Sequence, residues 1–463
     1  MVLDVVVLAA GKGTRMYSDK PKVLHAIGGR PMLAHVVDTA GALPGARLHI
    51  VVGAGAGAVK ACFSNHSGIN WVSQEQQLGT GHAVAQALPA IAGEDGTVLV
   101  LYGDVPLIRP QSLEALLAAG GADTVALLTL VTDTPHGLGR ILRNDRGQVT
   151  AIVEEKDASE EQKQIREINS GIIALPSSRL HDWLSRIGND NRQGEYYLTD
   201  VIALAVADGC QIATTSTGES PEVQGVNDKK QLAALERYYQ MRKAEELLNA
   251  GVTLADPARL DIRGDVHCGK DVSLDVNVIL EGAVSIGDNS CIGPNVVIRN
   301  SRIGDNVIVL ANCHIEGAII GNGCTVGPFA RIREGTVLEA SAKIGNFVET
   351  KKAVIGKASK VNHLSYIGDA EIGDDVNIGA GTITCNYDGA NKHVTVIGKG
   401  SFIGSNSVLV APVTIEEHGF VAAGSAINTN VPKGSLAVAR SKQRNISGWQ
   451  RPHKDKVKTK TES

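Results

Sequence analysis

Aromatic side chains are scarce in this sequence: Phe, Trp and Tyr together supply 16 of the 463 positions. Glycine is in surplus, with 52 residues, about 11% of the chain against an ordinary share of ~7%. The shortage of aromatics excludes a core built throughout on large rings, so part of the interior must consist of small and β-branched side chains. Together the two imbalances predict a repetitive architecture in part of the chain.

Three further absences exclude whole classes of protein. The net charge is −4 with a pI near 6.4, so the basic surface of a dedicated nucleic-acid-binding protein is lacking. The seven cysteines never form a C-x-x-C pair, which excludes a disulfide framework and a zinc ribbon and favours a reducing, cytoplasmic compartment. No window approaches ~18 consecutive apolar residues, so we expect no membrane span. The first apolar stretch, Val2–Ala10, is broken by Asp4 and is predicted to be a buried strand rather than a signal peptide.

The chain falls into parts of different period, and its length predicts two or three domains. In residues 1–227 apolar strand-like runs alternate with helical patterns, which predicts an α/β domain with a parallel sheet whose functional edge lies at the carboxyl ends of the strands. Residues 228–249 carry Leu and Tyr at helical spacing among charged residues and are predicted to form a linker helix. The expected strands are Val5–Leu8, Leu48–Val52, Ile69–Val72, Val98–Tyr102 and Val125–Leu130, and the expected helices lie near Met32–Thr39, Thr80–Leu88 and Ser112–Ala119.

A six-residue period dominates residues 250–440, where glycine directly follows many of the recurring aliphatic residues. This period fits neither a helix nor simple strand alternation. It is the signature of a parallel β-helix whose coils stack aliphatic side chains inside. The alternative, a set of unrelated short strands, does not explain so many matches in phase. The recurring positions include Ile286, Ile292, Ile298, Ile303, Val309, Ile315, Ile320, Val326, Ile332, Leu338, Ile344, Ile355, Val361, Ile367, Ile397, Ile403, Leu409, Ile415, Val421 and Ile427.

Two segments depart from the repeat. Between Thr384 and Ile397 thirteen residues replace twelve, and the polar stretch Cys385–His393 is predicted to leave the coil as a loop, the part of a solenoid that often carries function. Residues 441–463 lack the repeat and are predicted to be a disordered basic tail, with alternating lysines at Lys454, Lys456, Lys458 and Lys460.

A glycine-rich segment follows the first strand: residues 8–16 are Leu-Ala-Ala-Gly-Lys-Gly-Thr-Arg-Met, and Pro21-Lys22 come after it. Such a turn exposes backbone N–H groups that can hold phosphate, and Arg15 and Lys22 can neutralise charge on a transferring group. A G-x-G alone could be only a tight turn, and the dinucleotide pattern G-x-G-x-x-G is absent because Met16 takes its last position. The whole string resembles the sugar-phosphate nucleotidylyltransferases.

Further motifs, in order along the chain, narrow the resemblance: Gln74 with Leu78-Gly79-Thr80-Gly81, Tyr102-Gly103-Asp104, Gly139-Arg140, Glu154, residues 167–171 and Gly225-Val226-Asn227. Joined to a long hexapeptide β-helix, they resemble the family of bifunctional N-acetylglucosamine-1-phosphate uridylyltransferase/glucosamine-1-phosphate acetyltransferases over essentially the whole chain before the tail. The resemblance implies a Rossmann-like nucleotidylyltransferase domain in residues 1–227, a linker helix in 228–249 and a left-handed parallel β-helix acetyltransferase domain in 250–440.

For the first domain the resemblance implies the residues of uridylyl transfer. Arg15 and Lys22 would face the phosphates of UTP, and Asp104 and Asn227 would ligate Mg²⁺ through oxygen. Asp104 could instead only form a turn, and Asn227 could be the N-cap of the linker helix. Leu138 departs from the aromatic residue expected of the family at the sugar pocket wall. The implied UTP and sugar site comprises Leu8, Ala9, Ala10, Gly11, Lys22, Gln74, Gly79, Thr80, Tyr102, Gly103, Asp104 and Asn227, with Gly139, Glu154 and Asn169 on the N-acetylglucosamine.

For the second domain the resemblance implies an acetyltransferase site. Glucosamine-1-phosphate carries largely ammonium at neutral pH, so a base must take its proton as the nitrogen attacks the thioester of acetyl-CoA, and His363 is the expected base. A lone His in a solenoid could equally be a surface residue, and His314 and His393 serve as controls. A covalent acetyl-cysteine at Cys385 is an alternative without a visible base. The implied substrate and coenzyme contacts are Arg333, Lys351, Tyr366, Asn377, Ala380, Asn386, Tyr387, Ser405, Ala423 and Arg440.

The resemblance therefore implies an enzyme that makes UDP-N-acetylglucosamine for cell-envelope polysaccharide. It would acetylate glucosamine-1-phosphate and then transfer uridylyl from UTP to N-acetylglucosamine-1-phosphate, releasing pyrophosphate. Two rivals stay open: a single-function nucleotidylyltransferase, such as an ADP-glucose pyrophosphorylase, with a non-catalytic β-helix, and a non-catalytic scaffold of the same folds. The flat faces of the β-helix also predict a homotrimer with acetyltransferase sites between subunits. No nucleic-acid or membrane partner is expected.

Overall fold

The computed structural model describes residues 2–91, 93 and 96–452. The chain divides into two compact units, residues 1–268 with 274–284 and residues 269–273 with 285–463. The basic tail predicted from the four alternating lysines at 454–460 lies outside the described residues.

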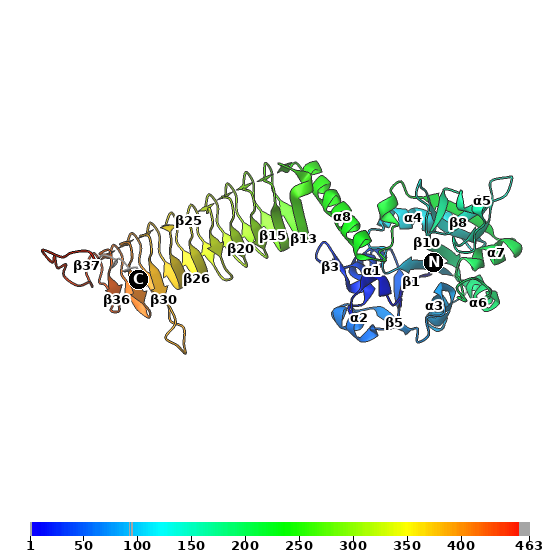
Figure 1. Ribbon diagram of the computed structural model, residues 1–463, viewed down its shortest axis with the longest axis horizontal. Coiled ribbons are helices and arrows are strands. Elements are labelled where there is room, and N and C mark those ends of the chain that lie inside the picture. The colour runs from blue at the N-terminus through cyan, green and yellow to red at the C-terminus, as the bar shows by residue number, and fades with distance from the viewer. Residues whose placement is uncertain (1, 92, 94–95, 453–463) are drawn as a thin grey trace, which may run out of the picture. The chain divides into compact units, whose positions relative to one another are not determined.

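The first unit contains a nine-stranded sheet in the order β11-β7-β10-β6-β1-β4-β5, with β8 beside β10 and β9 beside β8 (Figure 1). Strand β1 pairs in parallel with both β4 and β6, so that Leu8 stands opposite Val51 and Tyr102. The central strands are buried on both faces, which explains their continuous apolar runs. The strands are β1 (Val2–Ala9), β4 (Ala46–Val52), β5 (Ile69–Ser73), β6 (Gly96–Tyr102), β7 (Thr124–Val131), β8 (Arg140–Arg143), β9 (Val149–Val153), β10 (Glu167–Pro176) and β11 (Gln211–Ser216), with a separate ladder of β2 (Ala26–Ile27) and β3 (Arg30–Pro31).

The sheet is mixed rather than wholly parallel, which corrects the prediction. Strand β10 runs antiparallel to β6 and β7, and β8 and β9 form an antiparallel hairpin. The apolar pattern did not reveal β10 because polar Asn169 and Ser170 lie inside it, where the pairing with β7 shifts register. The amino-acid composition of a strand does not indicate whether it runs parallel or antiparallel to its neighbour. That orientation depends on the segment of chain that connects the two strands.

Helices cover both faces of this sheet, because two separate buried clusters join it to different helices. The first cluster packs α1 (Met32–Gly41), α2 (Ala56–Cys62) and α4 (Pro110–Ala119) on one face. The second packs α3 (Thr80–Ala87), α6 (Ser177–Arg186) and α7 (Asp200–Ala207) on the other, and α5 (Glu160–Lys163) is a single turn. The arrangement confirms the α/β class and places the strand ends at an open edge.

A long helix, α8 (Lys229–Asn249), follows in the same unit. The side chain of Asp228 caps it by accepting a hydrogen bond from the Gln231 amide at 2.8 Å. The cap is therefore Asp228, and the alternative role of Asn227 as N-cap is wrong. The Gln240 side chain donates to the Ile262 carbonyl and accepts from the Ile262 amide, so α8 is fastened to β13 (Leu260–Cys268). No helix in the described part of the chain is long and apolar enough to cross a membrane.

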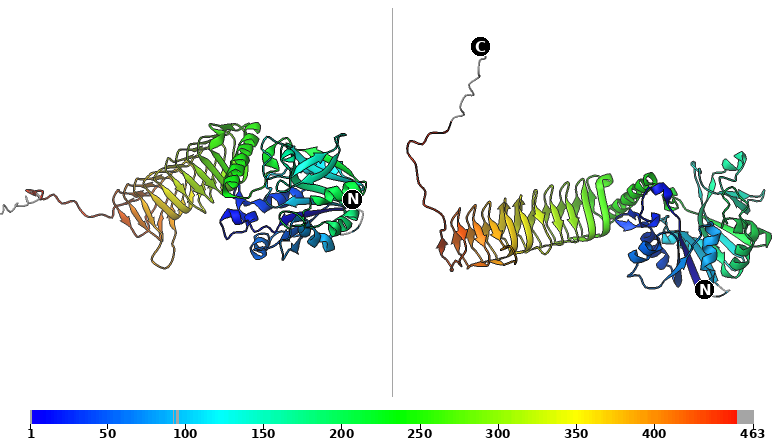
Figure 2. Two further views of the ribbon diagram at one scale, coloured as in Figure 1. Left: turned by 45° about the vertical axis from the view of Figure 1, so that its right-hand side comes forward. Right: turned by 60° about the horizontal axis from the view of Figure 1, so that its bottom comes forward.

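The second unit is a stack of short parallel strands, which Figures 1 and 2 show as successive coils. Ile292 pairs above Val309, Val309 above Val326, and Val326 above Ile344. Every recurring aliphatic residue of the six-residue pattern is buried, and the β-helix of hexapeptide repeats is confirmed. After β12 (Thr253–Leu254), β14 (Ser273–Leu274) and β15 (Val278–Ile286), the strands are β16 (Cys291–Ile292), β17 (Val297–Arg299), β18 (Arg302–Ile303), β19 (Ile308–Val309), β20 (His314–Glu316), β21 (Ile319–Ile320), β22 (Thr325–Val326), β23 (Arg331–Ile332), β24 (Val337–Leu338), β25 (Lys343–Asn346), β26 (Glu349–Ile355), β27 (Lys360–His363), β28 (Tyr366–Ile372), β29 (Asn377–Ile378), β30 (Ile383–Cys385), β31 (Thr395–Ile397), β32 (Phe402–Ile403), β33 (Val408–Val410), β34 (Val413–Ile415), β35 (Phe420–Val421), β36 (Ala426–Ile427) and β37 (Leu436–Ala437).

The stack is interrupted between β30 and β31, where a loop leaves the coil (Figure 1). An ordinary coil is 17 or 18 residues long, as the pairs Ile355 with Ile372 and Ile397 with Ile415 show. Ile372 instead pairs with Ile397, 25 residues further on. The thirteen residues from Thr384 to Ile397 therefore take the place of one six-residue repeat. The sequence analysis compared them with two repeats, or twelve residues, and so underestimated how long the projecting loop is.

Candidate active sites

The candidate phosphate-binding segment follows β1. The Gly103 amide, directly after β6, donates to the Leu8 carbonyl at 2.9 Å, so the carboxyl ends of β1 and β6 meet. A Cβ at Gly103 would come within 3.3 Å of the Ala9 side chain, so glycine allows this close approach. Gly13 has a φ of 61° and begins the short helix Thr14–Met16. Arg15 is exposed and has no ion-pair partner in the described part of the chain, which leaves its charge available to an anionic ligand.

Lys22 is the centre of the most sharply defined cluster. Its ammonium donates to Oδ2 of Asp104 and lies 3.4 Å from Oδ1 of Asn227. The side chains of Lys22 and Asp104 are only 13% and 15% exposed. The Val226 amide donates to the Asp104 carbonyl at 2.9 Å, which holds the segment before α8 against the end of β6. The fold thus joins three predicted residues, the outermost 205 positions apart in sequence.

Gln74 lies directly after β5 and is buried. Its side-chain amide donates to the Gly79 carbonyl at 3.2 Å, while its amide oxygen accepts no hydrogen bond from a described residue. The Thr80 hydroxyl accepts from the Leu198 amide at 3.0 Å. Gly79 has a φ of 117°, and a Cβ there would lie 2.5 Å from the Tyr196 carbonyl oxygen, so only glycine fits. The predicted residues at 74, 79 and 80 therefore form one rigid corner.

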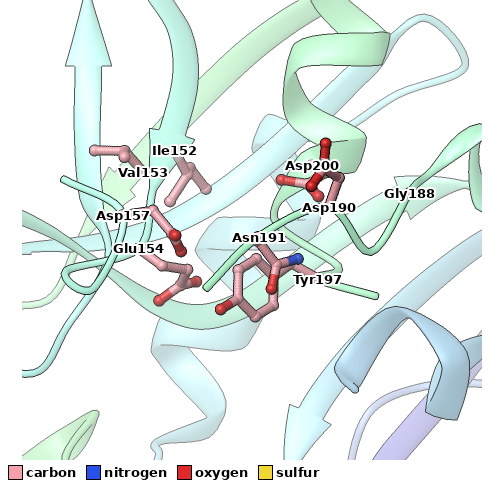
Figure 3. A pocket seen from close by; sticks show the side chains of 9 residues that line it. All are labelled: Ile152, Val153, Glu154, Asp157, Gly188, Asp190, Asn191, Tyr197 and Asp200. Atoms are coloured by element: carbon pink, nitrogen blue, oxygen red, sulfur yellow. The ribbon is translucent and has the colours of Figure 1, made fainter. Parts of the chain in front are cut away.

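A cavity of about 370 Å³ lies beside Glu154 (Figure 3). The Thr199 hydroxyl donates to Oε1 of Glu154 at 3.1 Å. Burial raises the pKa of Glu154, and the charges of Asp200 and Asp157 raise it further, while the Thr199 hydrogen bond acts in the opposite direction. The lining residues are Ile152, Val153, Glu154, Asp157, Gly188, Asp190, Asn191, Tyr197 and Asp200.

The other predicted sugar-site residues converge on Glu154. A Cβ at Gly139 would lie 3.5 Å from both carboxylate oxygens of Glu154, and the Asn169 amide donates to the Gly139 carbonyl at 2.9 Å. Leu138 does not line the cavity. Sequence reasoning missed Thr199, Asp190 and Asp200 because residues 188–200 contain no motif of recognisable spacing, and it also missed Asp157, three residues after Glu154.

Tyr102 lies within electrostatic reach of both clusters. Burial raises the pKa of its phenol, and the charges of Glu154 and Asp104 raise it further. A Cβ at Gly171 would lie 2.6 Å from the ring, so the glycine after Asn169 and Ser170 makes room for it. The charges of the predicted metal ligand Asp104 and of the cavity residue Glu154 thus both act on this phenol.

In the second unit His363 ends β27 and is exposed. Its Nδ1 lies 2.8 Å from Oδ1 of Asn346, one coil earlier. An amide oxygen only accepts, so Nδ1 carries the hydrogen and Nε2 keeps a lone pair. This tautomer is the one that a general base needs. Sequence reasoning missed Asn346, although its position one coil, 17 residues, before His363 was a usable signal.

The two control histidines have different surroundings. Nε2 of His314 is buried and has no hydrogen-bond partner among the described residues. Nε2 of His393 lies 2.8 Å from Oδ2 of Asp388, so its outer nitrogen is already engaged. Of these three histidines only His363 is exposed, and its Nε2 has no hydrogen-bond partner among the described residues.

The expected coenzyme contacts lie in one column along a corner of the β-helix. At this corner an amide of each coil donates to a carbonyl of the coil before it. The connecting hydrogen bonds are Gly381 to His363 at 3.2 Å, Asn406 to Ala380 at 2.7 Å and Gly424 to Ser405 at 2.8 Å, and the Arg440 guanidinium donates to the Ala423 carbonyl at 2.6 Å. Asn377 lies in β29, three residues before Ala380.

Three cationic side chains of the second unit also lie near one another. The charges of Lys392 and Arg333 lower the pKa of the Lys351 ammonium. Glu349 holds Arg333 through an ion pair of 2.7 Å, and no other carboxylate among the described residues pairs with these three cations. Lys392, which comes from the projecting loop, was missed by sequence reasoning. The cluster suits an anion such as a sugar phosphate.

The projecting loop is shaped by its own hydrogen bonds. The Asn386 side chain donates to Asp369 of the preceding coil, and the His393 amide donates to the Asn386 carbonyl at 2.8 Å. Tyr387 is 59% exposed. The thiol of Cys385 has no hydrogen bond to a base in the described part of the chain, which gives the acetyl-cysteine alternative no support. Tyr366 packs against Gly368, where a Cβ would lie 2.5 Å from the phenol oxygen.

Three family models match successive parts of the chain. A MobA-like NTP transferase domain matches residues 5–168, the GMPPB C-terminal domain matches residues 262–348, and a hexapeptide repeat of succinyl-transferase matches residues 394–429. The first covers the glycine-rich segment and the sheet strands up to the start of β10, and the other two fall in the region of hexapeptide coils.

Relatives that carry the name bifunctional protein GlmU match nearly the whole chain. The protein of Marinobacter nauticus is 56% identical over 452 residues, which are 98% of this chain and 99% of the relative. The protein of Pseudomonas putida strain GB-1 is 57% identical over 456 residues, 98% of this chain and 100% of the relative. The protein of Cellvibrio japonicus is 56% identical over 451 residues, 97% of this chain and 99% of the relative.

Proposed function

The chain belongs to the family of bifunctional GlmU proteins, and on this premise we propose which residues carry each of its two reactions. It is an N-acetylglucosamine-1-phosphate uridylyltransferase and a glucosamine-1-phosphate acetyltransferase, and it makes UDP-N-acetylglucosamine. The observation that carries this function is a match at 56% identity over 98% of the chain, both units included. The single-function and scaffolding alternatives are therefore set aside.

Asp104 and Asn227 would hold Mg²⁺ for uridylyl transfer. A carboxylate and an amide oxygen are ligands that suit this ion, and here they converge on one cation, the Lys22 ammonium. When bound, Mg²⁺ neutralises charge on the triphosphate oxygens. The exposed Arg15 and the amides of residues 10–13 lie at the same strand edge, where they would hold the phosphates.

In this reaction a phosphate oxygen of N-acetylglucosamine-1-phosphate attacks the α-phosphorus of UTP, and pyrophosphate leaves. Gln74, held in place through Gly79, would present its free amide oxygen to the uracil edge. Glu154 and Asn169 would bind the sugar, because both line the part of the fold around Gly139. The cavity beside Glu154 supplies the room.

In the acetyl transfer Nε2 of His363 would take a proton from the amine of glucosamine-1-phosphate while the nitrogen attacks the thioester carbonyl, and the coenzyme A thiolate leaves. Asn346 supports this role because its amide oxygen keeps the hydrogen on Nδ1. Arg333, Lys351 and Lys392 would hold the sugar phosphate. The corner column from His363 to Arg440 would carry coenzyme A.

We also propose a homotrimer, and an apolar ridge on the second unit supports it. Three successive coils place Phe329, Phe347 and Leu364 at a left-handed corner, with φ of 56°, 55° and 50°, although this conformation costs a non-glycine residue roughly 1–2 kcal/mol. The same corner holds Asn312 in the coil before Phe329, Gly381 in the coil after Leu364 and Asn406 in the coil after that. The ridge side chains are 50%, 55% and 63% exposed. A strained apolar ridge beside His363 is explained if a second copy of the chain covers it.

Incubation with glucosamine-1-phosphate, acetyl-CoA, UTP and Mg²⁺ tests the two activities together. Mass spectrometry should detect UDP-N-acetylglucosamine, with coenzyme A and pyrophosphate released in equal amounts. Omission of acetyl-CoA should stop both, and added N-acetylglucosamine-1-phosphate should restore pyrophosphate release alone. A product mixture without UDP-N-acetylglucosamine contradicts the function.

A further inference from the structure

We propose that the Lys22 ammonium occupies the metal site of the uridylyltransferase until a metal ion and UTP displace it together. This inference rests on the proposed assignment of Asp104 and Asn227 as metal ligands. It assigns to Lys22 a role in the free protein that is separate from any contact with phosphate.

The contacts of Lys22 define this role. Its ammonium donates to Oδ2 of Asp104 and lies 3.4 Å from Oδ1 of Asn227, so one positive charge stands against both oxygens that would ligate the metal. Both charged side chains are more than four-fifths buried. The ion pair is therefore shielded from bulk water, and a divalent cation that binds Oδ2 of Asp104 must displace the ammonium from it.

The surroundings allow the ammonium to move while the backbone stays in place. The backbone at Lys22 is held by the turn Lys22–Leu24, in which the His25 amide donates to the Lys22 carbonyl at 3.2 Å. The Lys22 Cβ also abuts the glycine-rich segment, since a Cβ at Gly13 would lie 2.7 Å from it. The side chain thus starts beside the phosphate-binding segment and ends at the metal ligands. Rotation about its four side-chain bonds can carry the ammonium from Asp104 toward phosphate.

This exchange couples the two ligands. A metal ion that takes Asp104 releases the Lys22 ammonium, and the released charge favours a triphosphate at the glycine-rich segment. UTP that attracts the ammonium frees Asp104 for the metal in turn. Thermodynamic linkage requires the two effects to be equal, and couplings of this kind are typically about 5–150-fold in affinity.

Binding of Mn²⁺ to the full-length protein, followed through the EPR signal of the free ion, tests the exchange without any assay of activity. In the absence of nucleotide, Lys22→Met should bind Mn²⁺ at least about tenfold more tightly than the unchanged protein. Lys22→Arg, which keeps the charge, should not. Saturating UTP, corrected for the complex of Mn²⁺ with UTP in solution, should tighten Mn²⁺ binding less in Lys22→Met than in the unchanged protein.

Lys20→Met is the matched control, because Lys20 is exposed on the same segment and has no contact with Asp104; its Mn²⁺ affinity should be unchanged. If Lys22→Met does not fold, as thermal unfolding would show, Lys22→Gln carries the comparison. If Asp104→Asn binds Mn²⁺ as tightly as the unchanged protein does, the proposed metal site itself is wrong. Loss of binding in Asp104→Asn together with no gain in the uncharged Lys22 variants overturns the exchange alone.

Discussion

The two units differ in where they place the residues proposed to bind phosphorylated sugars. In the α/β unit the predicted residues come from strand ends and loops that meet at one edge, and Lys22, Asp104, Gln74 and Asn169 are largely buried. In the β-helix unit the predicted residues stand on the outside of a stack of coils, and His363, Tyr387, Ser405 and Ala423 are exposed.

The difference follows from how each fold uses its interior. A sheet with helices on both faces leaves an open edge where loops of different length form a concave site. A β-helix fills its interior with one aliphatic residue per six, so every functional side chain must point outward from a convex surface. The first proposed site therefore draws all its residues from one unit of one chain, whereas in the proposed homotrimer a second copy would add a further surface to the second site.

The strongest test of this separation is Asp104→Ala. It should abolish uridylyl transfer and leave acetyl transfer at its normal rate, because in the proposed assignment only the first reaction would use this carboxylate as a metal ligand. Pyrophosphate release and coenzyme A release, measured on the same preparation, report the two reactions. EDTA should reproduce the result in the unchanged protein, and pyrophosphate release that persists in both cases would show that Asp104 has another role.

The converse test is His363→Ala. Acetyl transfer should fall by about 10²–10⁴-fold, the usual contribution of a positioned general base, while uridylyl transfer is unchanged. Asn346→Ala should lower the rate less, because the imidazole tautomer is no longer held, and Asn346→Gln or Asn346→Asp, which keep an acceptor oxygen, should restore part of it. His393→Ala and His314→Ala should do much less than His363→Ala. An equal loss in His393→Ala would move the base onto the projecting loop.

Phe347→Asn separates the folding of a coil from assembly. Asparagine suits the left-handed corner, so the coil itself should be at least as stable in thermal unfolding. Removal of the exposed ring should nevertheless weaken the trimer and lower acetyl transfer at low protein concentration, without effect on uridylyl transfer. Light scattering alongside both assays measures this. Ser341→Asn, at another exposed left-handed corner with φ of 60°, is the control, and a trimer that withstands Phe347→Asn to the same dilution argues against the ridge as the interface.

Glu154→Gln should have the smallest effect, a rise of less than about tenfold in the KM for N-acetylglucosamine-1-phosphate, because glutamine keeps one acceptor and a hydrogen bond contributes ~1 kcal/mol.

The same variant tests the pH dependence of stability. Burial, with the charges of Asp200 and Asp157, raises the pKa of Glu154, which means that its protonated form favours the folded state. This stabilisation is present below the ordinary pKa of 4.5 and is lost as the pH rises through the raised value. The variant should therefore unfold at a higher temperature than the unchanged protein at pH 8 and at nearly the same temperature near pH 4. If the difference in unfolding temperature between the variant and the unchanged protein does not vary with pH, Glu154 does not cause this pH dependence.

Local pattern determined much of this protein. The six-residue period, the glycine-rich segment after the first strand and the charged helix before Asn249 are each contained in fewer than about twenty-five neighbouring residues, and a coil or a turn is decided by such short stretches. The same applies to the α/β alternation of the first half. For this reason the class of both units could be predicted from the sequence alone.

Tertiary structure decided what depends on partners distant in the chain. The antiparallel course of β10, the contact of Lys22 with Asp104 and Asn227, and the addition of Lys392 to the cation cluster all join segments whose sequences do not indicate one another. The hydrogen bond between His363 and Asn346 is different, because the coil spacing of 17 residues did point to it. The direction in which a strand runs and the partner that a charged side chain finds are those that give the whole folded unit its lowest free energy. That free energy depends on burial, strand register and charge compensation together. No single stretch of sequence determines this total free energy, so these features could be identified only after the pairing of the strands and the stacking of the coils were known.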